Sequence, residues 1–158
     1  EGRTVEGVGE GAIPVSENPA GTLLLASSGG PKGLPASARS LGEETTRLDR
    51  VEPNLNESKP GDPRDTTTPL AMLRDIQELL FGTALSAASK EQLKQWMVAN
   101  KTGDKRMRAG LPATWEVGDK TGTGNNGVYV PPANAPGCRG RGALCRRWRP
   151  SDRRGRRG

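Results

Sequence analysis

Apolar residues recur at helical spacing between residues 69 and 82 of the chain. Thr68 can cap a helix here, and Pro69 suits the first helical position because its missing N–H would have no partner there. Gly82 is placed to end the helix. We therefore expect a helix with one apolar face, made of Leu70, Leu73, Ile76, Leu79 and Leu80.

A second helix is predicted shortly after the first. Ser89 and Gln92 fit a capping box at its start. Leu93, Trp96 and Met97 then fall on one face at helical spacing. We expect the two helices to pack against each other in the core.

The first third of the chain is less regular. Glycine recurs through residues 1–12 and disfavours a helix, so we expect a loose segment there. The apolar stretch at residues 20–26 is predicted to be a helix that Gly29 stops, with Pro31 just beyond. Another helix is predicted over residues 34–41.

Polar residues dominate the long stretch from 42 to 68, which has little apolar periodicity. Loops of this length in compact domains are usually functional or disordered. Residues 115–121 suit a strand, although their alternation is imperfect. From residue 131 onward neither periodicity is present.

Composition and charge separate the carboxyl-terminal tail from the rest. Hydrophobic residues make up 32% of the 158 residues, and Gly (22) and Pro (13) dilute the core. Of the net charge of +6, the tail from 131 to 158 carries nine arginines against Asp152. Cys138 and Cys145 also lie in this tail, and the chain has no histidine. We therefore expect no metal site and no cofactor.

Short motifs follow one another along the chain in a fixed order. Glu52 lies 36 positions after Ser16, and Lys120 lies 68 positions after Glu52. In order and spacing the series resembles the class A serine β-lactamases over residues 12–128. The motifs are Ser16-Glu17-Asn18, Arg47 to Asn56, Gly61 to Pro69, Arg108-Ala109-Gly110 and Gly118 to Thr123.

The resemblance implies an α/β (α+β) fold in which a helical domain packs against an antiparallel sheet, with the active site between them. Residues 13–130 would be a partial domain of this kind, with much of its sheet missing. Residues 1–12 would be a loose or damaged segment, and residues 131–158 a disordered tail rich in Arg, Gly and Pro.

The implied chemistry opens a β-lactam ring through an acyl-serine that water then hydrolyses. By resemblance Glu52 orients and deprotonates that water, and the Asn56 amide holds it. Ser16 would relay a proton, with Lys120 as the fourth catalytic residue. The alternative is that Glu52 and Asn56 are ordinary loop residues.

Substrate binding is assigned by the same resemblance. Lys120 and Thr121 would attract the substrate carboxylate, and Gly122 would allow close approach of the backbone. The backbone N–H of Thr123 would form half of an oxyanion hole. The expected binding residues are Asn18, Thr121, Gly122, Thr123 and Arg106. A neighbouring arginine, Arg108, is expected to be structural, and an extended segment would place it on the same face as Arg106.

A loop that carries a catalytic base has to be rigid. The resemblance implies that Arg50 and Asp65 pair across the neck of the loop, with Arg47 and Asp49 as a further local pair. The alternative is four solvated charges that each contribute little.

Three departures from the family limit the implied activity. No Ser-x-x-Lys motif, which holds the family's nucleophile, occurs in the 158 residues. Glu17 stands where an aspartate is expected, and Pro19 and Gly21 follow it in a predicted helix. The tail from about residue 131 looks like the product of a shifted reading frame in a GC-rich gene. We therefore expect this chain alone to be inactive.

The expected partner is a small β-lactam, and the parent protein is expected to be a monomer that is periplasmic or secreted. The chain shows no signal peptide and no membrane-spanning run, so no membrane partner is expected. The alternative function is a non-catalytic fragment whose arginine-rich tail binds nucleic acid nonspecifically through phosphates, which we rank lower.

Overall fold

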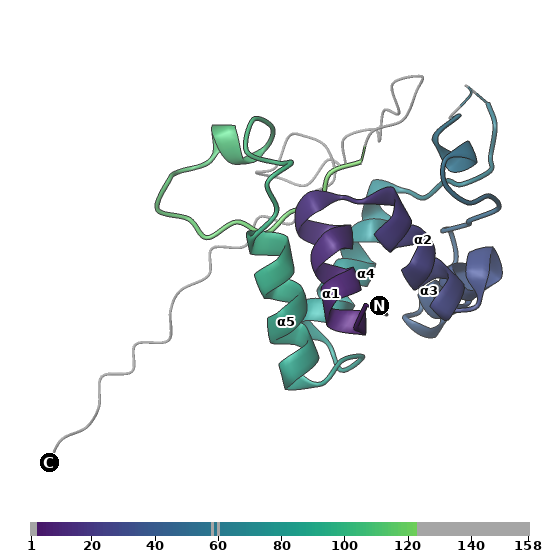
Figure 1. The fold of residues 1–158 in the computed structure, drawn as a ribbon, viewed down its shortest axis with the longest axis horizontal. Helices are drawn as coiled ribbons and strands as arrows, with labels where there is room; N and C mark the ends of the chain where they lie inside the picture. Colours follow the sequence, from purple (N-terminus) through teal and green to yellow (C-terminus); the bar gives the residue numbers. More distant parts are fainter. Residues whose placement is uncertain (1–2, 58, 60, 123–158) are drawn as a thin grey trace, which may run out of the picture.

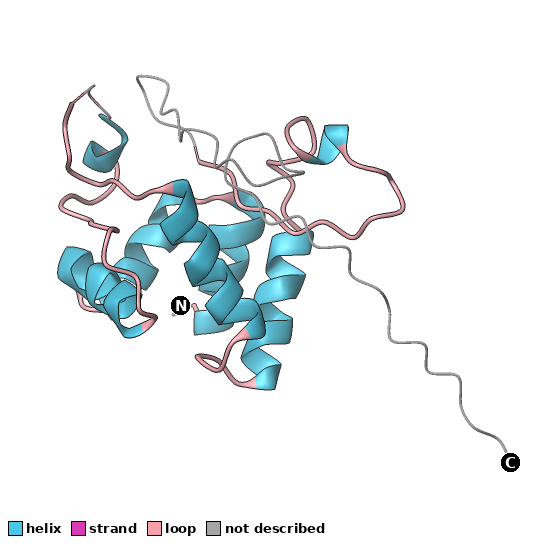
Figure 2. Cartoon of the chain, turned by 180° about the vertical axis from the view of Figure 1, so that it is seen from behind, coloured by secondary structure: helices cyan, strands magenta, loops and turns pink. Residues whose placement is uncertain are grey.

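The computed structural model describes residues 3–57, 59 and 61–122, and these residues fold into helices joined by loops (Figures 1 and 2). No strand forms within these ranges. The α-helices are α1 (Val5–Glu10), α2 (Asn18–Ser27), α3 (Gly33–Ser40), α4 (Pro69–Phe81) and α5 (Ala87–Val98). Shorter turns of π or 3-10 helix are η1 (Gly11–Val15), η2 (Gly30–Lys32), η3 (Asn54–Glu57) and η4 (Arg108–Gly110).

The two central helices form as the sequence predicts and pack against each other. The Thr68 side chain caps α4 by accepting a hydrogen bond from the Ala71 N–H at 3.1 Å, and Gly82 follows the last turn. The start of α5 was predicted three residues late. Ser86 is the cap, and its hydroxyl accepts from the Ser89 N–H at 3.1 Å, so Ser89 lies inside the first turn.

The expectation of a loose segment at residues 1–12 is wrong over residues 5–10. Thr4 caps α1 by accepting a hydrogen bond from the Gly7 N–H at 3.1 Å. Gly9 lies against the ring of Trp96 in α5, and a Cβ on Gly9 would come within 2.4 Å of that ring. Packing against α5 thus outweighs the low helix propensity of glycine, which costs about 1 kcal/mol relative to alanine.

The predicted helices at residues 20–26 and 34–41 are present as α2 and α3. Gly29 adopts the left-handed conformation (φ 93°) just after α2, as a helix-stopping glycine does. Pro19 lies in the first turn of α2, where no N–H is required, so it starts the helix and does not break it.

The predicted strand at residues 115–121 is not formed. This segment runs beside the end of α5, where the Asp119 N–H donates to the Met97 carbonyl at 3.1 Å. A strand needs a neighbouring strand to pair with its backbone, and none is present in the described residues. The segment is consequently an extended connection held by side chains.

Two long connections, residues 42–68 and 99–122, carry most of the predicted site residues. Figure 1 shows both along the upper side of the helices, at opposite ends of that side. No helix in the part of the chain that is described combines the length and the apolar character needed to span a bilayer.

Candidate functional site

The neck of the first long connection is closed by backbone and side-chain contacts. The Arg47 N–H donates to the Thr66 carbonyl at 3.0 Å, and the hydroxyls of Thr46 and Thr67 lie 2.7 Å apart. Arg47 also pairs with Asp49 at 2.6 Å, as predicted. The residues between are therefore held as a closed loop.

Asp65 is the main anchor of this loop. One of its carboxylate oxygens accepts from the N–H groups of Asp49 at 2.7 Å and Arg50 at 2.9 Å. The other oxygen contacts the Arg50 Nε at 2.5 Å, which confirms the predicted pair. The Asp65 side chain is only 4% exposed. Burial alone would raise the pKa of Asp65, but these hydrogen bonds overcome it and lower the pKa.

Arg50 extends the anchor to the tip of the loop. Its guanidinium donates to Glu57 at 2.8 Å and lies 3.8 Å from Asp62. Asp62 in turn pairs with Arg64 at 2.7 Å, and hydrogen bonds from Arg64 hold the pKa of Asp62 far below its usual value. Several ion pairs sharing one arginine make a network that orders the loop more than isolated surface pairs would.

Glu43 is buried where the chain enters the loop. Burial opposes its ionisation, yet hydrogen bonds from Thr46 and Thr45 lower its pKa to about 2. The Arg39 guanidinium lies 3.5 Å from the same carboxylate. The entrance of the loop is thus fixed by an ionised group at neutral pH.

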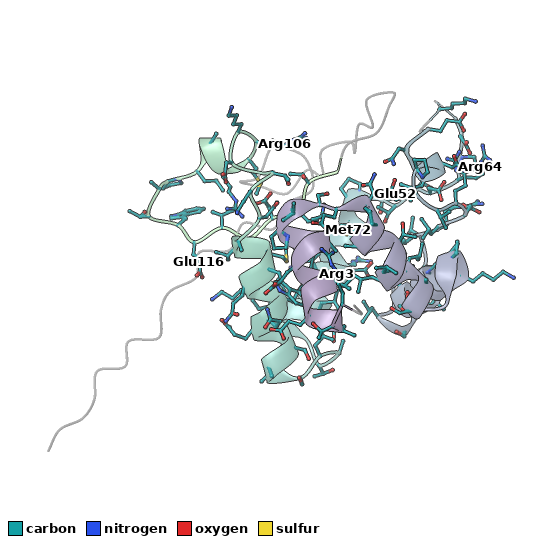
Figure 3. The ribbon with its side chains drawn as sticks, viewed as in Figure 1. Arg3, Glu52, Arg64, Met72, Arg106 and Glu116 are labelled. Carbon is teal, nitrogen blue, oxygen red and sulfur yellow. The ribbon has the colours of Figure 1, made fainter. Side chains whose placement is uncertain are left out.

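Glu52 and Asn56 meet inside the loop. Asn56 lies in the 3-10 turn η3, two residues after its start. Its Nδ2 donates to the Glu52 Oε2, and also to the Pro53 carbonyl at 3.2 Å. Figure 3 shows Glu52 on the side of the loop nearer the helices and Arg64 on its outer side. A carboxylate and an amide held side by side in this way can both bind the same water molecule.

Ser16 and Lys120 meet from opposite ends of the described chain. The Lys120 Nζ donates to the Ser16 Oγ at 2.7 Å and to the Thr121 carbonyl at 2.8 Å. Partial burial of the Lys120 ammonium lowers its pKa, and the nearby Asp119 carboxylate opposes this. A lysine with a lowered pKa beside a hydroxyl is suited to proton transfer.

The backbone between η1 and α2 sets the position of Ser16. Ser16 adopts the left-handed conformation (φ 63°), and the next N–H, that of Glu17, donates to the Gly11 carbonyl at 3.0 Å. The longer side chain of Glu17 turns away to pair with Arg3 at 3.0 Å. The replacement of aspartate by glutamate is therefore accommodated in the structure.

Lys120 is held by a buried junction beneath it. Asn100 is 1% exposed, and its Nδ2 donates to the Asp119 carbonyl at 3.0 Å and to the Asp119 Oδ2 at 2.8 Å. The Arg108 Nε contacts the other Asp119 oxygen at 2.5 Å, and Arg108 also donates to the Met97 carbonyl at 2.8 Å. Gly103 is needed here, because a Cβ would lie 1.9 Å from Asp119.

Comparison with known proteins matches the family described as "Beta-lactamase enzyme family" over residues 3–130. The chain belongs to this family. Among curated relatives, β-lactamase AST-1 of Nocardia asteroides is 52% identical over 141 residues, covering 85% of this chain and 46% of the relative. β-Lactamase CTX-M-6 of Salmonella typhimurium is 52% identical over 125 residues, covering 79% and 43%.

Solved structures of class A β-lactamases agree with this assignment and with the α/β fold class. An ancestral class A β-lactamase is 62% identical with a TM-score of 0.78, covering 80% of this chain and 49% of that chain. A class A β-lactamase from Rhodopseudomonas palustris is 59% identical with the same TM-score. The chain spans about half the length of the β-lactamases it matches.

The β-lactamase site residues predicted from sequence fall into two groups in the structure. Glu52 and Asn56 are in contact with each other, and Lys120 donates hydrogen bonds to both Ser16 and the Thr121 carbonyl. Asn18 is exposed at the start of α2, and Gly122 is exposed at the end of the described residues. Thr123 and the tail from 131 to 158 lie outside the described residues. The predicted frame shift and the predicted nucleic-acid binding both concern this tail.

The prediction that Arg106 and Arg108 share a face of an extended segment is wrong. Residues 101–107 form turns, in which the Arg106 N–H donates to the Gly103 carbonyl at 2.9 Å, and η4 begins at Arg108. Arg108 is structural, as expected, because it anchors Asp119. Figure 3 shows Arg106 with the second long connection, on the same upper side of the helices as Glu52.

Asn100 and Thr102 were missed as site residues by sequence reasoning. The signal in the sequence is a second Lys-Thr-Gly motif at residues 101–103. It follows α5, and the Thr102 hydroxyl lies 2.5 Å from the Thr121 hydroxyl.

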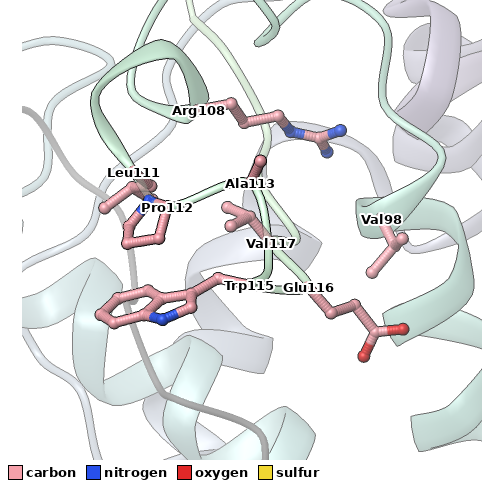
Figure 4. A pocket seen from close by; sticks show the side chains of 8 residues that line it. All are labelled: Val98, Arg108, Leu111, Pro112, Ala113, Trp115, Glu116 and Val117. Carbon is pink, nitrogen blue, oxygen red and sulfur yellow. The ribbon is translucent and has the colours of Figure 1, made fainter.

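A cavity of about 270 Å³ lies apart from these groups, between the end of α5 and the segment after η4 (Figure 4). Figure 4 shows Leu111, Pro112 and Trp115 on one side of it and Val98 of α5 on the other. It contains none of the predicted catalytic or binding residues. Its lining is Val98, Arg108, Leu111, Pro112, Ala113, Trp115, Glu116 and Val117.

Proposed function

We propose that this chain is the part of a class A β-lactamase that activates the hydrolytic water and binds the substrate carboxylate. The observation that carries the proposal is the 2.7 Å contact between Lys120 and Ser16. It joins two motifs separated by 104 positions, in the arrangement that proton transfer beside a bound β-lactam requires.

The chemistry assigned to the loop is the second half of the reaction. Glu52 takes a proton from water while the water oxygen bonds to the acyl carbon of an acyl-serine. The bond from that carbon to the serine oxygen then breaks, and the proton returns to this oxygen. Asn56 orients the water beside Glu52. A rigid loop is required because small displacements of the base cost large factors in rate.

The cradle for the anionic substrate is assigned to Lys120 and Thr121. A carboxylate that accepts charge-assisted hydrogen bonds from an ammonium and a hydroxyl is bound more strongly than its neutral ester. We further propose that the parent protein acts outside the cytoplasmic membrane as a monomer. Nonspecific nucleic-acid binding by the tail from 131 to 158 stays a lower-ranked prediction, because the tail lies outside the described residues.

A binding experiment tests the cradle without requiring turnover. The isotope-labelled chain is titrated with benzylpenicillin and with its methyl ester, and binding is followed by NMR. We expect the acid to bind about tenfold more tightly, the factor that one charge-assisted hydrogen bond supplies. Lys120→Met should abolish the preference.

The matched control is Lys101→Met, which alters the exposed lysine of the second Lys-Thr-Gly. This variant should keep the preference for the acid. Equal binding of acid and ester by the unaltered chain, or equal loss of preference in both variants, would contradict the proposal.

A further inference from the structure

The two Lys-Thr-Gly motifs of the chain touch through their threonines. The Oγ1 atoms of Thr102 and Thr121 are 2.5 Å apart, so one of the two hydroxyls donates a hydrogen bond to the other. Thr121 belongs to the proposed carboxylate cradle, whereas Thr102 follows α5. The direction of this hydrogen bond decides what Thr121 can offer a ligand.

Asn100 fixes that direction. Its Nδ2 faces two acceptors, the carbonyl and the carboxylate of Asp119, so its Oδ1 must be the atom that faces Thr102. This oxygen accepts from the Thr102 backbone N–H at 3.0 Å and from the Thr102 hydroxyl at 2.8 Å. The orientation of a buried amide is thus set by its surroundings.

A hydroxyl has one proton to donate. The Thr102 hydroxyl donates its proton to the Asn100 Oδ1, so toward Thr121 it can only accept. The Thr121 hydroxyl therefore donates to the Thr102 oxygen. In this state Thr121 presents only lone pairs to the site. Lone pairs repel a carboxylate. Without an anion, the Thr121 hydroxyl can therefore accept a hydrogen bond from a ligand but cannot donate one.

We propose that a carboxylate ligand reverses this pair of hydroxyls, and that Thr102 is a positioning residue for anionic substrates. The Thr121 hydroxyl turns its proton to the carboxylate, and the Thr102 hydroxyl turns to donate to Thr121. Asn100 Oδ1 keeps the Thr102 N–H, so it is not left unpaired. Each proton stays on its own oxygen, and no covalent bond is made or broken.

The reversal strengthens the contact to the anion. A hydroxyl that accepts one hydrogen bond is a better donor in the next, because neighbouring hydrogen bonds polarise each other. Thr102 thus acts through Thr121 and needs no contact with the ligand. The inference rests on the proposed carboxylate cradle.

The test extends the titration with benzylpenicillin and its methyl ester to variants of Thr102. Thr102→Val keeps the shape and removes the hydroxyl, and we expect it to weaken binding of the acid about fivefold, as the loss of one hydrogen bond does. Binding of the ester should not change. Thr102→Ser, which keeps the hydroxyl, should restore binding of the acid.

A double variant separates positioning from a structural role. In a Thr121→Val chain, Thr102→Val should have no further effect on binding, because the residue through which it acts is gone. A weakening that persists in this background, or that affects acid and ester equally, would overturn the relay. If the unaltered chain does not prefer the acid, the cradle itself is wrong and the relay with it.

Discussion

Asp65→Asn is expected to make the loop between residues 47 and 66 a preferred site of proteolysis. The asparagine keeps an oxygen for the N–H groups of Asp49 and Arg50, but its NH2 group would face the Arg50 Nε, where the second carboxylate oxygen now lies. Two donors would then oppose each other, and Arg50 would lose its most buried partner while keeping Glu57 and Asp62. Removing one partner of a buried pair is strongly destabilising.

The substitution removes the charge of Asp65 without changing the backbone conformation. Asp65 adopts the left-handed conformation (φ 55°), which asparagine tolerates as well as aspartate does. We expect limited proteolysis within the loop to be roughly tenfold faster, since cleavage follows the population of the open form. Glu44→Gln, which removes an exposed charge from the same connection, should leave the rate unchanged. Equal rates for all three chains would show that the pair does not hold the loop.

The same contact predicts a pH dependence. The pKa of Asp65 is lower in the fold than its value of about 3.9 in an unfolded chain, so the carboxylate stabilises the loop fully above that value. This stabilisation is lost as the pH falls below it. Amide exchange of the loop, measured relative to α5 in the same sample, should rise in acid for the unaltered chain and much less for Asp65→Asn.

Asn100→Leu is expected to lower the free energy of unfolding by about 2–4 kcal/mol, because it leaves several buried groups without partners. The Asn100 amide serves four hydrogen bonds, two to Asp119 and two from Thr102. Leucine has a similar size but none of these groups. The Asp119 carbonyl and the Thr102 N–H would each lose a hydrogen-bond partner within the protein.

Urea unfolding followed by circular dichroism measures this loss. Asn54→Leu makes the same chemical change at an exposed position of η3 and should alter stability by less than about 0.5 kcal/mol. Similar midpoints for the two variants would mean that the junction between residues 100 and 119 contributes little.

The sequence predicted those parts of the fold that local rules determine. The cap at Thr68 and the left-handed Gly29 each depend on neighbouring residues, and both are present. The helix α1 could not be predicted because it depends on Trp96, which lies 87 positions after Gly9 and covers it. The strand predicted at 115–121 is not formed, because a strand requires a neighbouring strand and the described residues contain none.

The candidate site shows the same division. The Arg50–Asp65 pair and the grouping of Glu52 with Asn56 followed from the family resemblance. The hydrogen-bond chain from Asn100 through Thr102 to Thr121 could not be read from spacing, because nothing in a turn sequence shows where a hydroxyl points. Such contacts become visible only when α5 and the segment before Lys120 are placed together.

The central claim is that this chain holds the water-activating residues and part of the carboxylate cradle of a class A β-lactamase without the nucleophile. The assay that tests it most directly is hydrolysis of a chromogenic β-lactam by the purified 158-residue chain. The predicted result is a rate equal to that of buffer alone. Turnover above that rate would show that a residue within the chain attacks the β-lactam ring, and would contradict the account.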